Sequence, residues 1–332
     1  MKRPFSEILL FIATIDSTFF RSPLMTHTTK AWLQIHLCVV LWGFTAILGK
    51  LITLDALPLV LWRMALVSCI LLLLPSVLRS LREMSPRLIG VYTGIGILVT
   101  LHWLTFYGAI RLSNASVAVT CIATVPVFLA ILEPLLAGRR FRFSELFLGV
   151  LVLPGIVLVV GGTPAAMNAG IVMGLISALF VALFAALNKR YVLKADALTV
   201  TSIEMTAGAL FLLLIGVFYQ LLPGLPTIAG IVETPADLFA LPQGNDVAWL
   251  LILALGCTLL PFVLSLIALR HLSAYASSLA VNLEPLYAIA LAVVFLGEQQ
   301  EVSASFYVGA ALIVTVVLIY PWWSRKGAEP AQ

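Results

Sequence analysis

Five charged side chains lie inside the hydrophobic stretches of this chain: Lys50, Arg63, Glu133, Glu204 and Glu284. A charge within an apolar helix costs about 2.5–3.5 kcal/mol on insertion scales, so such residues usually carry function. A carboxylate in this setting can carry a proton, pair with a buried cation or contact an amine on a substrate. The depth of each charge within its helix decides which of these roles is open to it.

Glu284 is the most central of the five. It lies roughly 16 Å from the end of its predicted helix, at about 1.5 Å per residue, and directly precedes Pro285. Proline removes a backbone donor and kinks a helix, and Pro126 occupies the matching place in an earlier helix. Matching interrupted helices mark the binding sites of transporters. We therefore predict that Glu284 lines a central cavity with Asn282 beside it; a structural ion pair is the alternative.

Arg63 and Glu204 hold matching positions near opposite ends of their helices. Arg63 lies roughly 9 Å from one end and Glu204 roughly 10 Å from the other, so we expect no direct bridge between them. Arg63 could instead reach towards Glu284. For Glu204, a place in the cavity and a packing role remain equally open.

Two further polar residues have weaker claims. His102 is either an element of the cavity or a lone histidine bonded to a neighbouring helix, and the second is the more usual case. Glu133 and Lys50 lie near helix ends, where their side chains are expected to reach water.

The helices that must position these residues follow from composition. Of the 332 residues, 62% are hydrophobic and 10% are charged, whereas soluble domains are about half apolar and one-quarter charged. A hydrocarbon core of roughly 30 Å requires about 20 apolar residues per helix. We predict an all-α integral membrane protein with ten spans, near 33–51, 57–78, 88–110, 114–137, 144–162, 170–190, 197–221, 246–269, 273–296 and 302–322.

Basic residues predict the orientation of these spans, because Lys and Arg favour cytoplasmic loops. Most of the 19 Lys and Arg residues fall before the first span, in alternate loops after it, and in the tail 323–332. Both termini are therefore predicted to be cytoplasmic. The net charge of +4 resides in these short loops, where topology and anionic lipid explain it, so nucleic acid is not an expected partner.

An internal repeat sets the domain organisation. Ala109, Arg111, Ala115, Pro126, Leu132, Gly138, Ser144 and Phe147 each recur 159 residues further on. Five spans per repeat force the second copy to enter the membrane inverted, an architecture of secondary transporters. We predict repeats at 31–163 and 170–322, with a long extracytoplasmic loop at 222–246 that is rich in Pro and Gly.

Other features bound the function. Residues 1–30 form an N-terminal tail, and we expect Met25 to be the true start, with 1–24 either outside the native chain or disordered. The four cysteines have no paired spacing, so no disulfide framework, metal site or cofactor is expected. We find neither a P-loop nor the sequence signatures of common hydrolases, so catalytic residues are not expected.

Several short motifs together resemble a known family. They are Trp42-Gly43-Phe44, Arg63, Ser113-Asn114-Ala115-Ser116, Asn282-Leu283-Glu284-Pro285 and Leu296-Gly297-Glu298. With the inverted repeat, they are similar to the EamA-domain carriers of the drug/metabolite transporter superfamily over residues 31–322. One departure is Gly138-Arg139, which stands where the second repeat has Gly297-Glu298; the family usually has acidic residues at both places.

The resemblance implies a multi-pass carrier of the bacterial inner membrane, often an exporter of amino acids or other small metabolites. Spans one to four and six to nine would surround the cavity, with spans five and ten peripheral. Proton coupling and a homodimer remain open. The alternatives are a lipid or nucleotide-sugar translocator and, in a different class, an integral membrane enzyme acting on lipid substrates.

Overall fold

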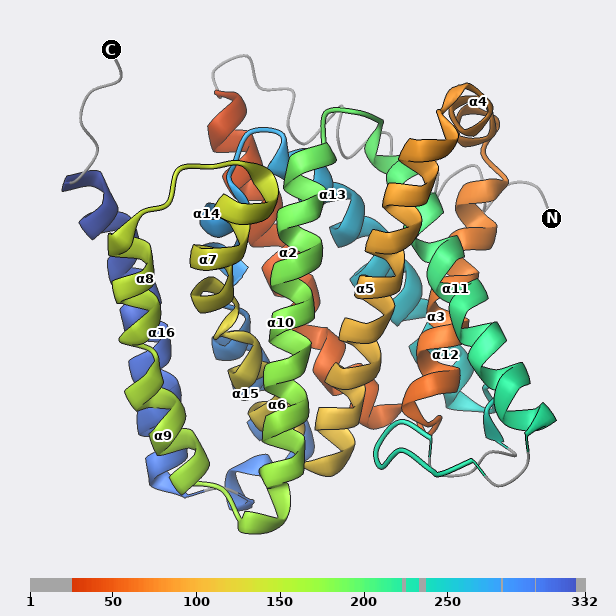
Figure 1. Ribbon diagram of the computed structural model, residues 1–332. Helices are drawn as coiled ribbons and strands as arrows, with labels where there is room; N and C mark the ends of the chain where they lie inside the picture. The colour runs from red at the N-terminus through yellow and green to blue at the C-terminus, as the bar shows by residue number, and fades with distance from the viewer. Residues whose placement is uncertain (1–25, 223–224, 233–236, 282, 302, 327–332) are drawn as a thin grey trace.

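The computed structural model describes residues 26–222, 225–232, 237–281, 283–301 and 303–326 (Figure 1). The predicted Asn282 and the tail 1–24 lie outside these residues. The helices are α2 (His27–Leu51), α3 (Ala56–Leu72), α4 (Pro75–Glu83), α5 (Pro86–Leu112), α6 (Ala115–Ile122), α7 (Val125–Ala137), α8 (Phe143–Val150), α9 (Leu153–Gly161), α10 (Asn168–Tyr191), α11 (Ala197–Leu221), α12 (Asn245–Ala254), α13 (Leu260–Leu269), α14 (Ala274–Val281), α15 (Glu284–Leu296) and α16 (Ala304–Lys326). A π-helical turn, Leu255–Leu259, joins α12 to α13.

The length and apolarity of these helices make the chain a multi-pass membrane protein. Six helical stretches within the described residues are long and apolar enough to span: His27–Leu51, Pro86–Leu112, Ala115–Ala137, Ala165–Tyr191, Ala197–Leu221 and Asn245–Leu269. The bent pair α3 and α4 makes a seventh if it is counted as one span. Helices also occupy the remaining predicted stretches: α8 and α9 form one interrupted pair, α14 and α15 form another, and α16 runs from Ala304 to Lys326. A helix suits this setting because it satisfies its own backbone hydrogen bonds without water.

The predicted span 57–78 is wrong at its C-terminal end. α3 stops at Leu72, and α4 continues at an angle of 88° to it. Leu74 is extended (φ −82°, ψ 120°) because the ring of Pro75 disfavours helical geometry in the residue before it. α4 carries exposed Arg79 and Arg82, which suits a helix that lies across the end of the bundle rather than within it.

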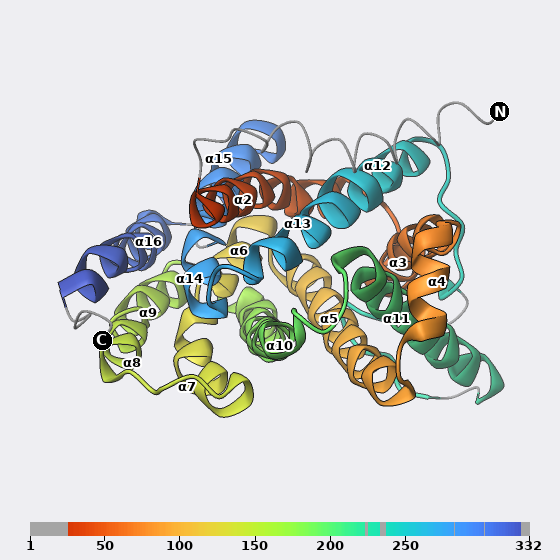
Figure 2. The ribbon, with the colours of Figure 1, turned by 90° about the horizontal axis from the view of Figure 1, so that it is seen from above.

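The helices form a bundle with two distinct edges (Figure 2). α16 packs against α9 at one edge, and α11 packs against α3 at the other. α10 lies centrally and contacts α5, α6 and α7, while α2 contacts α13, α14 and α15. α10 of the second repeat thus packs against the interrupted pair α6 and α7, and α2 of the first repeat packs against the interrupted pair α14 and α15. Both α2 and α10 lie between the two edges of the bundle.

The interrupted helices of the two repeats have corresponding boundaries. α6 ends at Ile122 and α7 begins at Val125, and α14 and α15 show the same break between Val281 and Glu284. Pro126 and Pro285 each occupy the second position of the new helix, where their missing N–H costs little. α7 and α15 then end at Gly138 and Gly297, with φ of 74° and 70°, a left-handed geometry that glycine adopts without strain.

The contact between α5 and α11 gives a test of the packing. A Cβ built on Gly96 would lie 2.7 Å from Glu204 Cα, against rigid backbone, whereas a Cβ on Gly94 would meet nothing within 4 Å. We expect Gly96→Ala to destabilise the protein by about 1–3 kcal/mol, because the two helices must separate. Gly94→Ala is the matched control and should leave stability equal or slightly higher, since alanine is the better helix former. Thermal unfolding of purified protein in detergent measures both; equal melting temperatures would contradict this packing.

Candidate functional site

A cavity lies among α2, α3, α5, α6, α7, α10, α13, α14 and α15. Its empty volume is about 1020 Å³, including open space at its boundary. Most of its wall is apolar or aromatic: Trp42, Trp103, Phe106, Ile122, Val125, Val181, Phe184, Ala185, Phe262, Leu266, Leu269, Ala274 and Val281. The polar residues of the wall are Thr45, Arg63, His102, Asn188, Ser265, Ser277, Ser278 and Glu284. The breaks of both interrupted helices therefore border the cavity.

Arg63 is fixed on the wall by contacts on several sides. Its side chain is 1% exposed, and its guanidinium carbon lies 3.9 Å from the centre of the Trp103 ring. Nε donates to Thr258 Oγ1 at 2.5 Å, Nη1 donates to Tyr107 Oη at 2.8 Å, and Nη2 donates to Cys257 O at 3.4 Å. A guanidinium has five N–H donors, so two remain for a ligand. Stacking on the indole lowers the cost of holding the charge away from water.

Glu284 lines the same cavity and is 7% exposed. It does not form the direct bridge with Arg63 that the sequence allowed, because the ion pairs among the described residues are confined to Arg139. Its position at the start of α15 places its charge beside the positive end of that helix, which favours a carboxylate. The cavity wall therefore carries one cationic and one acidic group that are not bonded to each other.

His102 lies in the cavity wall and contacts a neighbouring helix. It lines the cavity, and its Nδ1 lies 2.7 Å from Ser177 Oγ on α10. Ser177 Oγ also donates to the backbone oxygen of His102, and the imidazole lies between the Phe106 and Phe184 rings. The ring is therefore held in one orientation by α10.

Glu204 lies behind the wall and does not line the cavity. α11 contributes no lining residue, contrary to the expected ring of spans, because Gly96 lets α5 pack directly over the Glu204 backbone. The carboxyl group is 0% exposed, and neither oxygen has a hydrogen-bond partner within the described part of the chain. Asn188, which does line the cavity, lies beside the Glu204 carboxyl group. Glu204 is thus one side chain removed from the cavity.

Two further polar residues of the cavity wall carry an unsatisfied buried oxygen. Thr45 and Asn188 both line the cavity, and Thr45 Oγ1 and Asn188 Oδ1 are buried acceptors without partners among the described residues. A polar atom that is buried and unpaired is costly, so a ligand that donated to it would be favoured. The available signal was the placement of a polar residue within an apolar helix, which Asn188 shares with its charged neighbour Lys189.

The expectation that Glu133 reaches water was wrong. Its side chain is 1% exposed, and its two oxygens accept from Ala274 N at 2.9 Å and Tyr275 N at 2.8 Å, at the start of α14. Glu298 does the same at the start of α6, where it accepts from Ala115 N and Ser116 N at 3.0 and 2.9 Å. In each case, a carboxylate from one repeat satisfies the free donors at the first helix turn of the other repeat.

A family comparison matches the two repeats as separate stretches. The model of the EamA-like transporter family matches residues 29–161 and 168–320. The chain belongs to the EamA-like transporter family. The two matched stretches are the two EamA repeats, and Glu133 and Glu298 each contact the repeat to which they do not belong.

Solved structures share the fold of this chain. One, described as "Crystal structure of protein", aligns with a TM-score of 0.62 at 16% identity, over 90% of this chain and 99% of that chain. At this identity the likeness concerns the fold. No match was found among curated proteins.

The environment of Arg63 gives a second test. Thr258→Val removes the acceptor of Arg63 Nε, so we expect a loss of about 1–3 kcal/mol in stability, the cost of an unsatisfied buried donor. Ser265→Ala is the control, because Ser265 Oγ also lines the cavity region but donates to Phe262 O in its own helix. Its melting temperature in detergent should stay close to the parent value. A valine variant as stable as the parent would show that Arg63 does not depend on Thr258.

Proposed function

We propose that this EamA protein is a secondary transporter that exports amino acids or chemically related small metabolites by alternating access. The observation that carries the proposal is the presence of Arg63 and Glu284, unpaired with each other, in one largely apolar cavity. A free amino acid presents a carboxylate and an ammonium group. The two remaining N–H donors of Arg63 suit the carboxylate, and Glu284 suits the ammonium.

The aromatic wall narrows the proposed substrate further. Trp42, Trp103, Phe106, Phe184 and Phe262 surround the two charges. Apolar and aromatic walls favour a ligand with a sizeable apolar side chain, while a few polar groups fix its orientation. A nucleotide sugar fits less well, because Arg63 and His102 are the basic residues among the described lining and would face two phosphate groups.

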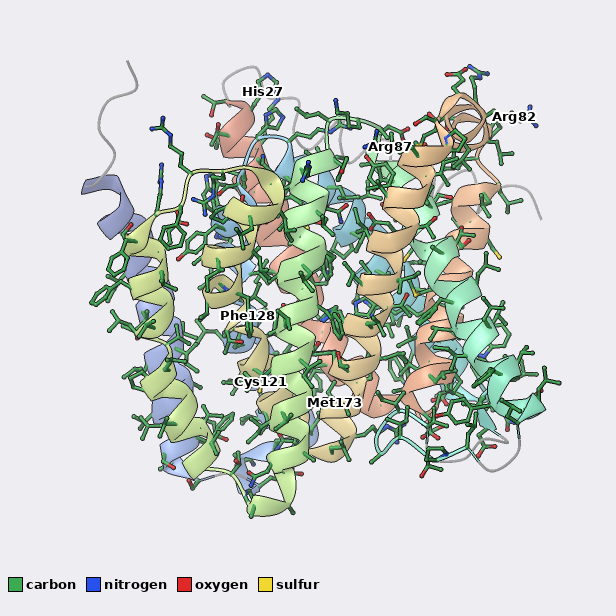
Figure 3. All side chains as sticks on the ribbon, viewed as in Figure 1. His27, Arg82, Arg87, Cys121, Phe128 and Met173 are labelled. Atoms are coloured by element: carbon green, nitrogen blue, oxygen red, sulfur yellow. The ribbon has the colours of Figure 1, made fainter. Side chains whose placement is uncertain are left out.

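The proposed setting is the inner membrane of a bacterium, with ten spans and both termini in the cytoplasm. α2 begins and α16 ends at the same end of the bundle (Figure 1), and His27, Arg82 and Arg87 lie at that end (Figure 3). Clustered basic residues favour the cytoplasmic side. The cavity residues Asn188 and Leu269 lie near the helix ends on this side, because α10 ends at Tyr191 and α13 ends at Leu269.

Glu284 is the proposed coupling residue. A carboxyl group that exchanges a proton as the cavity opens to each side could link export to the proton gradient. Glu204 is the second candidate, since it contacts the cavity through Asn188.

Glu284→Gln tests the proposal. Cells producing the parent protein should enrich the medium in one or a few amino acids, whereas the Gln variant should enrich them at least tenfold less, a loss of about 1.4 kcal/mol in transition-state stabilisation. Mass spectrometry of the medium measures this. Glu83→Gln, on exposed α4, is the matched control and should export normally. Equal export by all three proteins would remove Glu284 from the cycle, and enrichment of lipids or nucleotide sugars would replace the proposed substrate.

A further inference from the structure

The segment between α13 and α14, residues 269–275, borders one end of the cavity. Leu269 and Ala274, near its two ends, line the cavity, and Leu272 between them is buried against α2. The segment is short and belongs to the same end of the bundle as the C-terminus of α10. Its movement away from α10 and α7 would open this end of the cavity.

A lysine of α10 holds the first part of the segment. Lys189 Nζ donates to Leu269 O at 2.7 Å and to Leu272 O at 2.6 Å. Leu269 is the last residue of α13, where the helix dipole is negative and a cation is favoured, and Leu272 lies in the segment just beyond it. Lys189 directly follows Asn188, so the same turn of α10 lines the cavity and holds the segment.

A carboxylate of the other repeat holds the second part. Glu133 on α7 accepts from Ala274 N and Tyr275 N, the first two N–H groups of α14. Arg139 Nε lies 3.5 Å from Glu133 Oε2, and the Arg139 guanidinium also pairs with Glu145. The segment is therefore held on one side by a cation acting on carbonyls and on the other by an anion acting on N–H groups.

The opposite end of the cavity has one of these two contacts. Glu298 holds the start of α6 through Ala115 N, Ser116 N and Ser116 Oγ. Lys50, the basic residue near the end of α2, makes no hydrogen bond to the segment between α5 and α6 within the described residues. The two ends thus carry related but unequal sets of contacts.

We propose that residues 269–275 form a gate at the α13–α14 end of the cavity, held closed by Lys189 and Glu133. Both residues contact backbone groups at helix ends, so the gate opens by breaking hydrogen bonds without unfolding α13 or α14. The purpose of the gate rests on the proposed transport function, but its opening can be measured without any substrate.

Thiol labelling measures the opening. The background carries Cys38→Ala, Cys69→Ala and Cys257→Ala, and Ser277→Cys on α14 places a reporter in the cavity wall. Native Cys121 is kept, because it is buried between α6 and α10 away from the gate and reports unfolding (Figure 3). A membrane-impermeant maleimide is applied to each face of membrane vesicles, and the labelling rate of each cysteine is followed by mass spectrometry.

Glu133→Gln and Lys189→Met should each raise the labelling rate of the reporter by roughly tenfold from the gate face, the scale expected for losing a charge-assisted hydrogen bond. Glu298→Gln, the matched control at the opposite end, should not raise it from that face. Unchanged labelling in both gate variants, or an equal rise in the control, would overturn the proposal. If Glu133→Gln exposes Cys121, the Lys189→Met result decides, since that change leaves α7 and α14 intact. Loss of export with the expected labelling pattern would contradict the proposed function and leave the gate standing.

Discussion

The free backbone groups at the ends of interrupted helices are the constraint on which this structure depends. A helix that stops inside a bundle exposes donors at its start and carbonyls at its end, and the membrane supplies no water to satisfy them. Here charged side chains from neighbouring helices take that role. Glu133 and Glu298 bind helix starts, and Lys189 binds carbonyls at a helix end. Glu133 and Glu298 each reach from one repeat to the other, so the contacts that satisfy these helix starts also join the two repeats.

The two repeats place a carboxylate at the facing helix start from different positions in the sequence. In the second repeat the carboxylate directly follows the left-handed glycine, as Glu298 follows Gly297. In the first repeat Arg139 stands at that place, and the carboxylate comes from Glu133, earlier on α7. Both carboxylates reach the first two N–H groups of the facing helix. Arg139, the apparent departure from the family pattern, now pairs with Glu133 and Glu145. The geometry at the helix start is therefore retained although its position in the sequence is not.

Local signals predicted the parts of this site that depend on local chemistry. Proline at matching places predicted both helix breaks. Arg63 and Glu284, which stood out in the sequence as charges within apolar stretches, line one cavity. The same signals did not separate Glu284 from Glu204, because which helix lies in front of a carboxylate depends on packing partners such as Gly96. Glu133 was misjudged for a related reason: its partners are 141 and 142 residues away, and depth within a helix does not reveal a facing helix end. Whether a charge reaches water is a property of the assembled bundle.

The π-helical turn between α12 and α13 has a consequence for how this cavity could diversify. Such a turn accommodates one extra residue within a helix, and here it presents Cys257 O and Thr258 to Arg63. Removing one residue from Leu255–Leu259 would restore a regular helix and leave the residues beyond it in nearly the same orientation, because a π-turn absorbs its extra residue locally. Phe262 and Leu266 would therefore keep their places in the cavity wall, whereas the contacts of Cys257 O and Thr258 with Arg63 would be lost. A single-codon deletion at this turn would thus release Arg63 without rebuilding the rest of the wall.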